Sequence, residues 1–106
     1  MYARVVAFEN RDMSRIDELI ARVSRSFAEG RLPPGDGFLM LIDRDGGRAL
    51  GITLFDNVAA LEAAEPEFER MGDEIPEEIR GRRVSRDVYE VALAEFGAGA
   101  REKLHA

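Results

Sequence analysis

The sequence predicts one α+β domain whose elements follow the order β-α-β-β-α-β. Three observations carry this prediction. Phe38 to Phe55 contains two apolar runs joined by a glycine-rich turn, which is the pattern of a β-hairpin. A helical stripe of apolar residues precedes this hairpin, and a second one follows it. An apolar strand candidate lies near each end of the chain.

Composition fixes the class of protein before any element is placed. The 106 residues are 45% hydrophobic and 34% charged, which is typical of a single globular domain. Cysteine is absent, so disulfides, thiolate catalysis and cysteine–zinc sites are excluded. A net charge of -6 disfavours nucleic acid as a partner. We find no leader peptide pattern and no apolar run near the ~20 residues of a membrane span, so we expect a cytoplasmic protein without membrane partners.

The first strand and the first helix occupy the N-terminal third. Tyr2 to Phe8 is the predicted strand. Met13 to Ala28 is the clearest helix, because one 3.6-residue stripe contains Ile16, Leu19, Ile20, Val23 and Phe27. Either Asp12 or Ser14 could cap its N-terminus, and Gly30 is a natural C-terminal stop.

The hairpin follows a connection, Arg31 to Asp36, that contains two prolines and a glycine. Phe38 to Ile42 and Ala49 to Phe55 are its predicted strands. Asp45-Gly46-Gly47 supplies residues that tolerate positive φ in the turn. Gly51 in mid-strand suggests a bulge or the close approach of another group.

The second helix begins after a cap at Asp56 or Asn57. Its apolar side contains Val58, Leu61, Ala64, Phe68 and Met71. Pro66 cannot donate to the carbonyl of Glu62, so we expect a kink or a break there, and Gly72 ends the regular pattern.

The remaining elements are shorter. Asp73 to Gly81 is predicted to be irregular, with a helical turn starting at Pro76. Val84 to Leu93 is the last strand. We therefore expect a ferredoxin-like domain over residues 1–94, with a four-stranded antiparallel sheet and both helices on one face. Residues 95–106 form a C-terminal tail, either loose or laid on a partner.

The strands lack the alternation of a sheet with one solvated face. In the first hairpin strand, Phe38, Met40 and Ile42 point one way and Leu39 and Leu41 the other. In the return strand, Leu50, Ile52 and Leu54 point to one face, and Ala49 and Phe55 point to the other. Two helices can cover only one face, and a large exposed apolar face is unusual in a monomer. We therefore expect a homodimer whose sheets pack face to face.

The pattern resembles the dimeric α+β barrel superfamily, and within it the antibiotic-biosynthesis-monooxygenase-like group. The resemblance is carried by the segment from Asp43 to Phe55, D-R-D-G-G-R-A-L-G-I-T-L-F. It continues in a helix opening at Asn57 with Ala59, Ala60 and Leu61, and in the closing V-Y-E-V of Val88 to Val91. It implies an eight-stranded barrel of two sheets, with a small cavity between each sheet and its own helices. Members of this group include cofactor-independent monooxygenases, haem-degrading monooxygenases, isomerases and proteins of other activities.

Candidate site residues follow from this resemblance. Tyr89 and Asn10 are the catalytic candidates, because a cofactor-free monooxygenase needs a group that deprotonates a phenol and a donor that holds the anion. The binding candidates are Phe8, Phe38, Phe55, Asn57, Phe68, Met71 and Arg4, and core packing is the alternative for each apolar one.

Haem degradation is disfavoured. The segment Ala7-Phe8-Glu9-Asn10-Arg11 resembles the strand-end asparagine motif of the haem-degrading members. Tryptophan is absent, however, and the only histidine, His105, lies at the far end of the chain. We therefore expect no cofactor. No metal site is expected either, because the Asp43 and Asp45 carboxylates are too few for calcium.

A basic cluster, Arg80, Arg82, Arg83 and Arg86, precedes and enters the last strand. It could bind an anion, but pairing with the acidic run Glu62 to Glu78 is the favoured interpretation. The sequence thus predicts a homodimeric barrel protein that binds an apolar or aromatic small molecule, with cofactor-independent monooxygenation as one activity. The alternative is a non-enzymatic ligand-binding, stress-response or accessory protein of the same fold.

Overall fold

The computed structural model describes residues 1–10, 12–30 and 35–104. Arg31 to Pro34, the first part of the predicted connection from Arg31 to Asp36, and His105 lie outside these ranges. The elements, in chain order, are β1 (Tyr2–Glu9), α1 (Ile16–Ala28), β2 (Gly37–Asp43), β3 (Arg48–Phe55), α2 (Val58–Glu74), α3 (Glu77–Arg80), β4 (Arg82–Glu90) and α4 (Ala100–Leu104). The four strands form one antiparallel sheet in the order β2-β3-β1-β4. The predicted ferredoxin-like α+β fold is confirmed.

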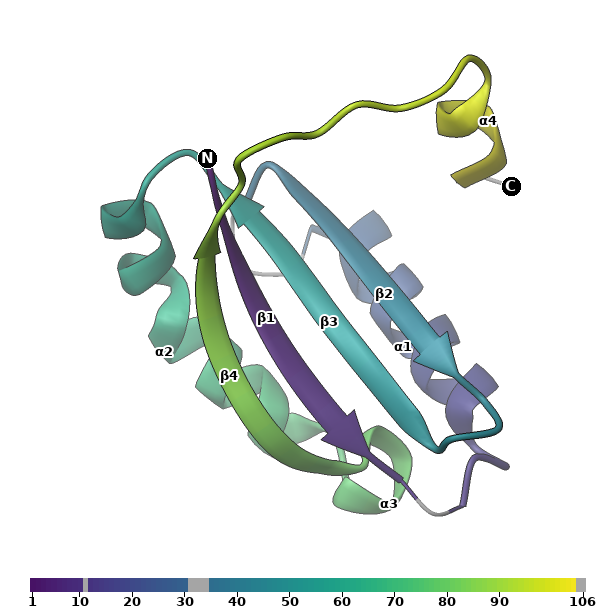
Figure 1. Ribbon diagram of the computed structural model, residues 1–106. Coiled ribbons are helices and arrows are strands. Elements are labelled where there is room, and N and C mark those ends of the chain that lie inside the picture. Colours follow the sequence, from purple (N-terminus) through teal and green to yellow (C-terminus); the bar gives the residue numbers. More distant parts are fainter. Residues whose placement is uncertain (11, 31–34, 105–106) are drawn as a thin grey trace.

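The domain has two layers. Figure 1 shows α1 and α2 behind one face of the sheet, which leaves the opposite face without a covering helix. After β4 the chain leaves the sheet and runs to α4, with Leu93 and Phe96 77% and 71% exposed. No helix within the described ranges has the length and apolarity that a bilayer crossing needs.

The first helix begins later than predicted, and its predicted caps are wrong. Arg15 occupies the N-cap position and makes no side-chain capping bond. The polar residues before it form turns instead, because Asn10 Oδ1 accepts from the Asp12 amide at 3.2 Å and Asp12 Oδ1 from the Ser14 amide at 2.9 Å. Asp17 and Glu18 lie in the first turn, where their charges favour the helix dipole.

The second helix begins as predicted but does not break. Asn57 is its cap and accepts from the Ala60 amide at 2.8 Å. The helix runs through Pro66 to Glu74, so of the expected kink or break at Pro66 the break is wrong, and so is the expected end at Gly72. The buried residues Leu61, Ala64 and Phe68 lie on both sides of the proline. Their packing holds the helix together across the one hydrogen bond that proline removes.

The hairpin turn forms at Gly47, whose φ is +66°. The predicted bulge at Gly51 is wrong, because β3 keeps an unbroken register with both neighbours. The irregularity lies in β4, between the partners of Ala7 and Phe8. That strand also begins before Val84 and ends before Leu93.

The hydrophobic core is divided into two clusters. The first joins the sheet to α2 through Phe55, Leu61, Ala64 and Phe68. The second joins α1 to α3 through Ile16, Leu19 and Ile79. The helices α1 and α2 are therefore held by different clusters. Neither cluster fills the space between them.

Replacing Gly72 by alanine will stabilise the fold by about 0.5–1 kcal/mol, because glycine inside a helix costs backbone entropy. A Cβ atom there meets nothing within 4 Å. Gly81→Ala is the matched control and should destabilise by about 1–3 kcal/mol, since its φ is +82° and a Cβ would lie 2.8 Å from the Glu9 carbonyl oxygen. Urea unfolding of both variants measures these changes in the free energy of unfolding. Equal effects of the two substitutions would contradict it.

Candidate functional site

A cavity of about 390 Å³ lies between the sheet and its helices. This volume is within the range of small-molecule sites. Strands β1, β2 and β3 form its floor, β4 closes one side, and α1, α2 and α3 form the roof. The cavity is lined by Leu19 and Val23 of the α1–α3 cluster and by Phe68 and Met71 of the cluster between α2 and the sheet. It therefore lies between the two clusters.

The floor explains why this space stays open. Gly51 lies in the middle of β3, paired with Val6 of β1 and Met40 of β2. A Cβ atom on Gly51 would have its nearest neighbour, a Phe38 ring carbon, at 3.9 Å. A side chain would therefore fit at this position, and glycine leaves its volume to the cavity.

One wall of the cavity carries a buried arginine. Arg4 is 5% exposed and donates through Nε and Nη2 to the Glu65 carboxylate at 3.0 and 2.9 Å. Its guanidinium carbon lies 3.9 Å from the centre of the Phe68 ring. Arg86 of β4 adds a second contact to Glu65 at 3.0 Å. The guanidinium is thus fixed by an ion pair on one side and an aromatic face on the other.

These contacts fix the charge of Glu65. Hydrogen bonds from Arg4 first, and then from Arg86, hold the pKa of the Glu65 carboxyl below its ordinary value of 4.5, while partial burial opposes the shift. Glu65 is therefore ionised at neutral pH, and its lowered pKa makes it a weak base. Its place in the site is to orient Arg4.

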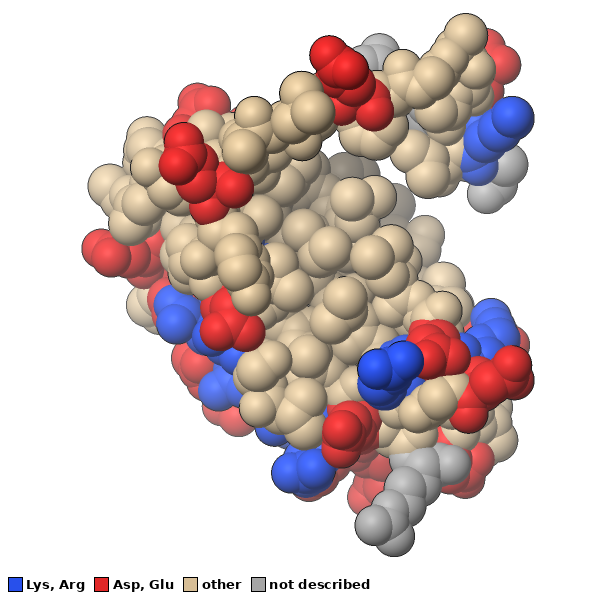
Figure 2. All heavy atoms as spheres, in the orientation of Figure 1, with Lys and Arg blue, Asp and Glu red and all other residues tan. Residues whose placement is uncertain are grey.

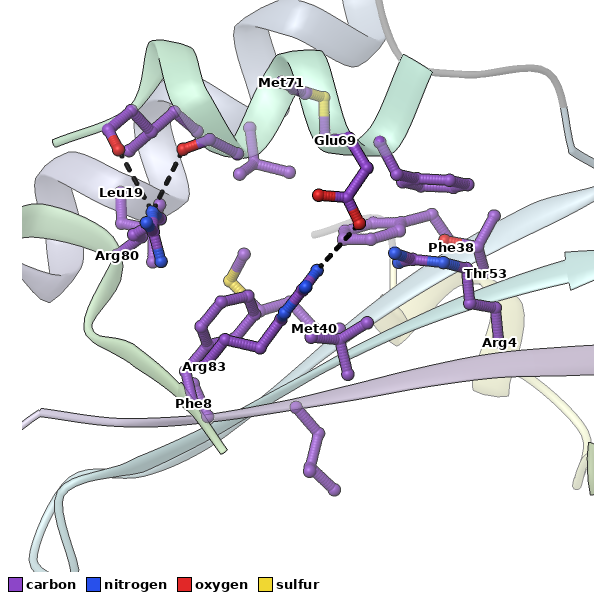
Figure 3. Close-up of a pocket in the computed structure, with 18 of the residues that line it drawn as sticks. Arg4, Phe8, Leu19, Phe38, Met40, Thr53, Glu69, Met71, Arg80 and Arg83 are labelled. Carbon is purple, nitrogen blue, oxygen red and sulfur yellow. Dashed lines mark hydrogen bonds and ion pairs between the residues drawn. The ribbon is translucent and has the colours of Figure 1, made fainter. Parts of the chain in front are cut away.

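Two further arginines bound the cavity. Arg83 of β4 contacts Glu69 of α2 at 3.3 Å, and Figure 3 shows this pair spanning the space between strand and helix. Arg80 donates to the backbone carbonyls of Gly72, Ile75 and Gly81, each at 3.1 Å. It thereby ties the end of α2 to α3 and closes that end of the cavity.

The predicted pairing of the basic cluster with the acidic run is confirmed for two members, Arg83 with Glu69 and Arg86 with Glu65. Arg82 pairs instead with Glu9, at 3.0 Å, and Arg80 binds backbone. Within residues 1–10, 12–30 and 35–104, no cluster of three or more His, Asp or Glu side chains could hold a metal ion.

Most of the predicted binding residues meet at this cavity. It is lined by Arg4, Phe8, Phe38, Phe68 and Met71. Phe55 lies instead in the core, 2% exposed, with its ring edge-to-face on Phe68 at 6.2 Å. Asn57 lies outside the cavity as the cap of α2.

Neither catalytic candidate lies among the residues that line the cavity. Asn10 follows β1, where its side chain accepts from Asp12 and its amide donates to the Gly47 carbonyl at 2.8 Å. Tyr89 pairs with Ala3 and is 57% exposed on the uncovered face of the sheet. Their catalytic roles stay predictions.

Sequence reasoning missed Thr53 and Glu69 as members of the site. Thr53 is 6% exposed and lies beside Arg4 in the β1–β3 ladder. The sequence could have indicated Thr53, because side chains alternate between the two faces of a strand and Thr53 therefore shares a face with Gly51 and Phe55. For Glu69, the signal was its position next to Phe68 on a helix with a predicted buried side.

Removing the Glu65 charge will make stability less dependent on pH. A carboxyl whose pKa is lower in the folded than in the unfolded state contributes stability above its unfolded pKa and loses it as the pH falls through the folded pKa. Glu65→Gln should therefore be destabilised at pH 7, and its difference from the parent should shrink toward pH 3. Glu62→Gln is the control, because among the described residues Glu62 has no ion pair. Urea unfolding at both pH values measures the effect, and a difference that grows in acid would refute it.

Comparison with known proteins shows the fold. Rv0793 from Mycobacterium tuberculosis has a similar structure, with a TM-score of 0.60 and 19% sequence identity. The match covers 91% of this chain and 98% of that chain. No protein-family model matches the sequence, and no curated protein matches it. The likeness at this identity is one of fold alone.

Proposed function

We propose that this protein binds a small, largely apolar molecule with a flat ring in the cavity between its sheet and helices. The observation that carries the proposal is the lining itself. Aromatic and thioether side chains from strands and helices surround the space, and polar groups reach it from Arg4, Thr53 and the Arg83–Glu69 pair. Apolar walls with polar groups that converge on the ligand are typical of small-molecule sites.

The test is to fill the cavity from its floor. Gly51→Val has room for its Cβ and should stabilise the strand while it occupies ligand volume. The neutral fluorophore N-phenyl-1-naphthylamine should bind the parent protein saturably, and Gly51→Val should weaken its binding at least about tenfold. The matched control is Gly97→Val, an exposed position in the tail with open space around it. Equal affinity for parent and Gly51→Val would place the probe elsewhere and refute the proposal.

A second candidate function, cofactor-independent monooxygenation of a phenol, is favoured by the Arg83–Glu69 pair. Such a reaction joins a phenol and O₂ to give a quinone and water. Glu69 could accept the phenolic proton, and Arg83 could hold the resulting phenolate. Oxygen uptake with bound phenols, abolished in Glu69→Gln, would support it. Binding of phenols without oxygen uptake would leave the protein a binding module.

We further propose that two copies pair through the uncovered face of the sheet. Figure 2 shows uncharged residues across this face, with charged ones at its margins. The register places apolar side chains there, namely Val5, Leu39, Leu41, Leu50, Ile52, Leu54 and Tyr89. Leu41 is 48% exposed in the single chain. An apolar face of this kind is typical of protein–protein contacts.

Light scattering tests the pairing. One chain is 11.8 kDa, and we expect a mass of twice that value at micromolar concentration. Leu41→Glu should restore the mass of one chain. The control is Phe27→Glu, since Phe27 is 64% exposed on α1, away from this face. A parent protein with the mass of a single chain would refute the pairing.

A further inference from the structure

Arg4 has hydrogen-bond donors to spare. Its Nε and Nη2 bind Glu65, but Nη1 has no hydrogen-bond partner among the described residues. Among the described residues, every side-chain nitrogen or oxygen that is fully enclosed has a hydrogen-bond partner. Because Nη1 has none, it is not fully enclosed and must keep some accessible surface. Since Arg4 is 5% exposed and lines the cavity, that surface belongs to the cavity. Figure 3 shows its nitrogens directed inward beside Thr53.

Thr53 supplies another free donor at the same wall. It is the cross-strand partner of Arg4, so both side chains stand on the helix-facing side of the sheet. Thr53 is 6% exposed, and its hydroxyl has no hydrogen-bond partner within the described residues. Because this unpaired hydroxyl is not fully enclosed and Thr53 lines the cavity, its Oγ1 is accessible from the cavity, as Arg4 Nη1 is. Two buried polar groups thus line the same wall, and among the described residues neither Arg4 Nη1 nor Thr53 Oγ1 has a protein acceptor.

The charge at the wall formed by Arg4 is positive although the chain is acidic. Glu65 is shared by Arg4 and Arg86, so these three side chains carry one net positive charge. Elsewhere the lining carries Arg80, Arg82 and Arg83 against Glu69, Asp73 and Glu77, and Arg82 also pairs with Glu9. The positive excess is therefore confined to the wall formed by Arg4. Inside a partly desolvated site, an excess positive charge beside free N–H and O–H donors favours an anionic oxygen.

We propose that the Arg4–Thr53 pair binds the anionic oxygen of an aromatic acid whose ring lies against Phe38, Met40 and Met71. The guanidinium Nη1 donates to one carboxylate oxygen and the Thr53 hydroxyl to the same or the other oxygen. Glu65 and Phe68 hold the guanidinium in place before the ligand enters, so little side-chain entropy is lost on binding. This inference rests on the proposed binding function and names the chemical class of its ligand.

A series of isosteres tests the ligand class. The probes are 2-naphthoate, the uncharged 2-naphthamide and the cationic 2-naphthylmethylamine at pH 7, measured by calorimetry. We expect 2-naphthoate to bind about tenfold tighter than the amide, and the amine to bind least. If the amide or the amine binds as tightly as the acid, the ligand class is wrong while the cavity function stands. If none of the three binds, both are overturned.

Two variants assign the recognition to these residues. Thr53→Val keeps the side-chain shape and should weaken 2-naphthoate about tenfold, with a smaller effect on the amide. Arg86→Gln removes the excess charge without touching the cavity lining and should weaken only the acid. Arg22→Gln, an arginine paired with Glu18 outside the cavity, is the matched control and should change neither affinity. Unchanged 2-naphthoate binding in Thr53→Val would refute the assignment.

Discussion

Replacing Arg4 by methionine will lower the free energy of unfolding by about 3 kcal/mol. The variant leaves the partly buried Glu65 carboxylate with Arg86 alone and removes the cation from the face of Phe68. Breaking a buried ion pair from one side is costly, because the remaining charge keeps its desolvation penalty. Arg86 limits the loss, since it stays in contact with Glu65. Urea unfolding at pH 7 measures the change.

The double variant separates the charge effect from packing. In Arg4→Met with Glu65→Leu, no charge is left unpaired in the core, and replacing both members of a buried pair by apolar residues is often neutral. We expect it to recover most of the stability that the single variant loses. A double variant as unstable as Arg4→Met would contradict this account of the pair.

Truncating Phe55 to alanine will cost about 3–5 kcal/mol, the largest effect we expect from one substitution. The side chain is 2% exposed and joins β3 to α2 through its contact with Phe68. Its removal leaves a void in the cluster that anchors α2 to the sheet. Thermal and urea unfolding measure the loss, with Phe96→Ala as control.

Phe96 is 71% exposed in the tail, so its truncation should change stability by less than about 0.5 kcal/mol. If both phenylalanine variants lose the same stability, the division between core and tail is wrong.

The topology followed from the sequence because each element carried a strong local signal. Gly47 marked the hairpin, Asn57 capped the second helix, and the apolar stripe of α1 gave its period. The cavity residues Arg4, Phe8 and Phe38 were also found, since strand parity places them all on the helix-facing side.

Long-range register decided what the sequence left open. Tyr89 looked like a pocket residue, but pairing with Ala3 puts it on the opposite face, and a shift of one residue would reverse this. Pro66 predicted a break from local chemistry, and tertiary packing of Leu61 and Phe68 overrode it. The free donors of Arg4 and Thr53 emerge only from the full set of side-chain contacts.

The two clusters of the core relate this fold to its proposed function. α1 packs on α3 and on the β2 residues Met40 and Ile42, whereas α2 packs on Phe55 of β3. A glycine in the central strand then leaves the space between them open. The cavity is thus a consequence of how the apolar residues are shared between the helices, and its buried polar wall comes from two strand residues, Arg4 and Thr53.

The most direct measurement is a methyl spectrum of the protein labelled at methionine. Of the four methionines, Met40 and Met71 line the cavity, whereas Met1 and Met13 do not. Titration with N-phenyl-1-naphthylamine should shift the Met40 and Met71 methyl signals together, with one saturation curve, and leave Met1 unchanged. Saturable binding that leaves the Met40 and Met71 signals in place would contradict a ligand site between the sheet and its helices.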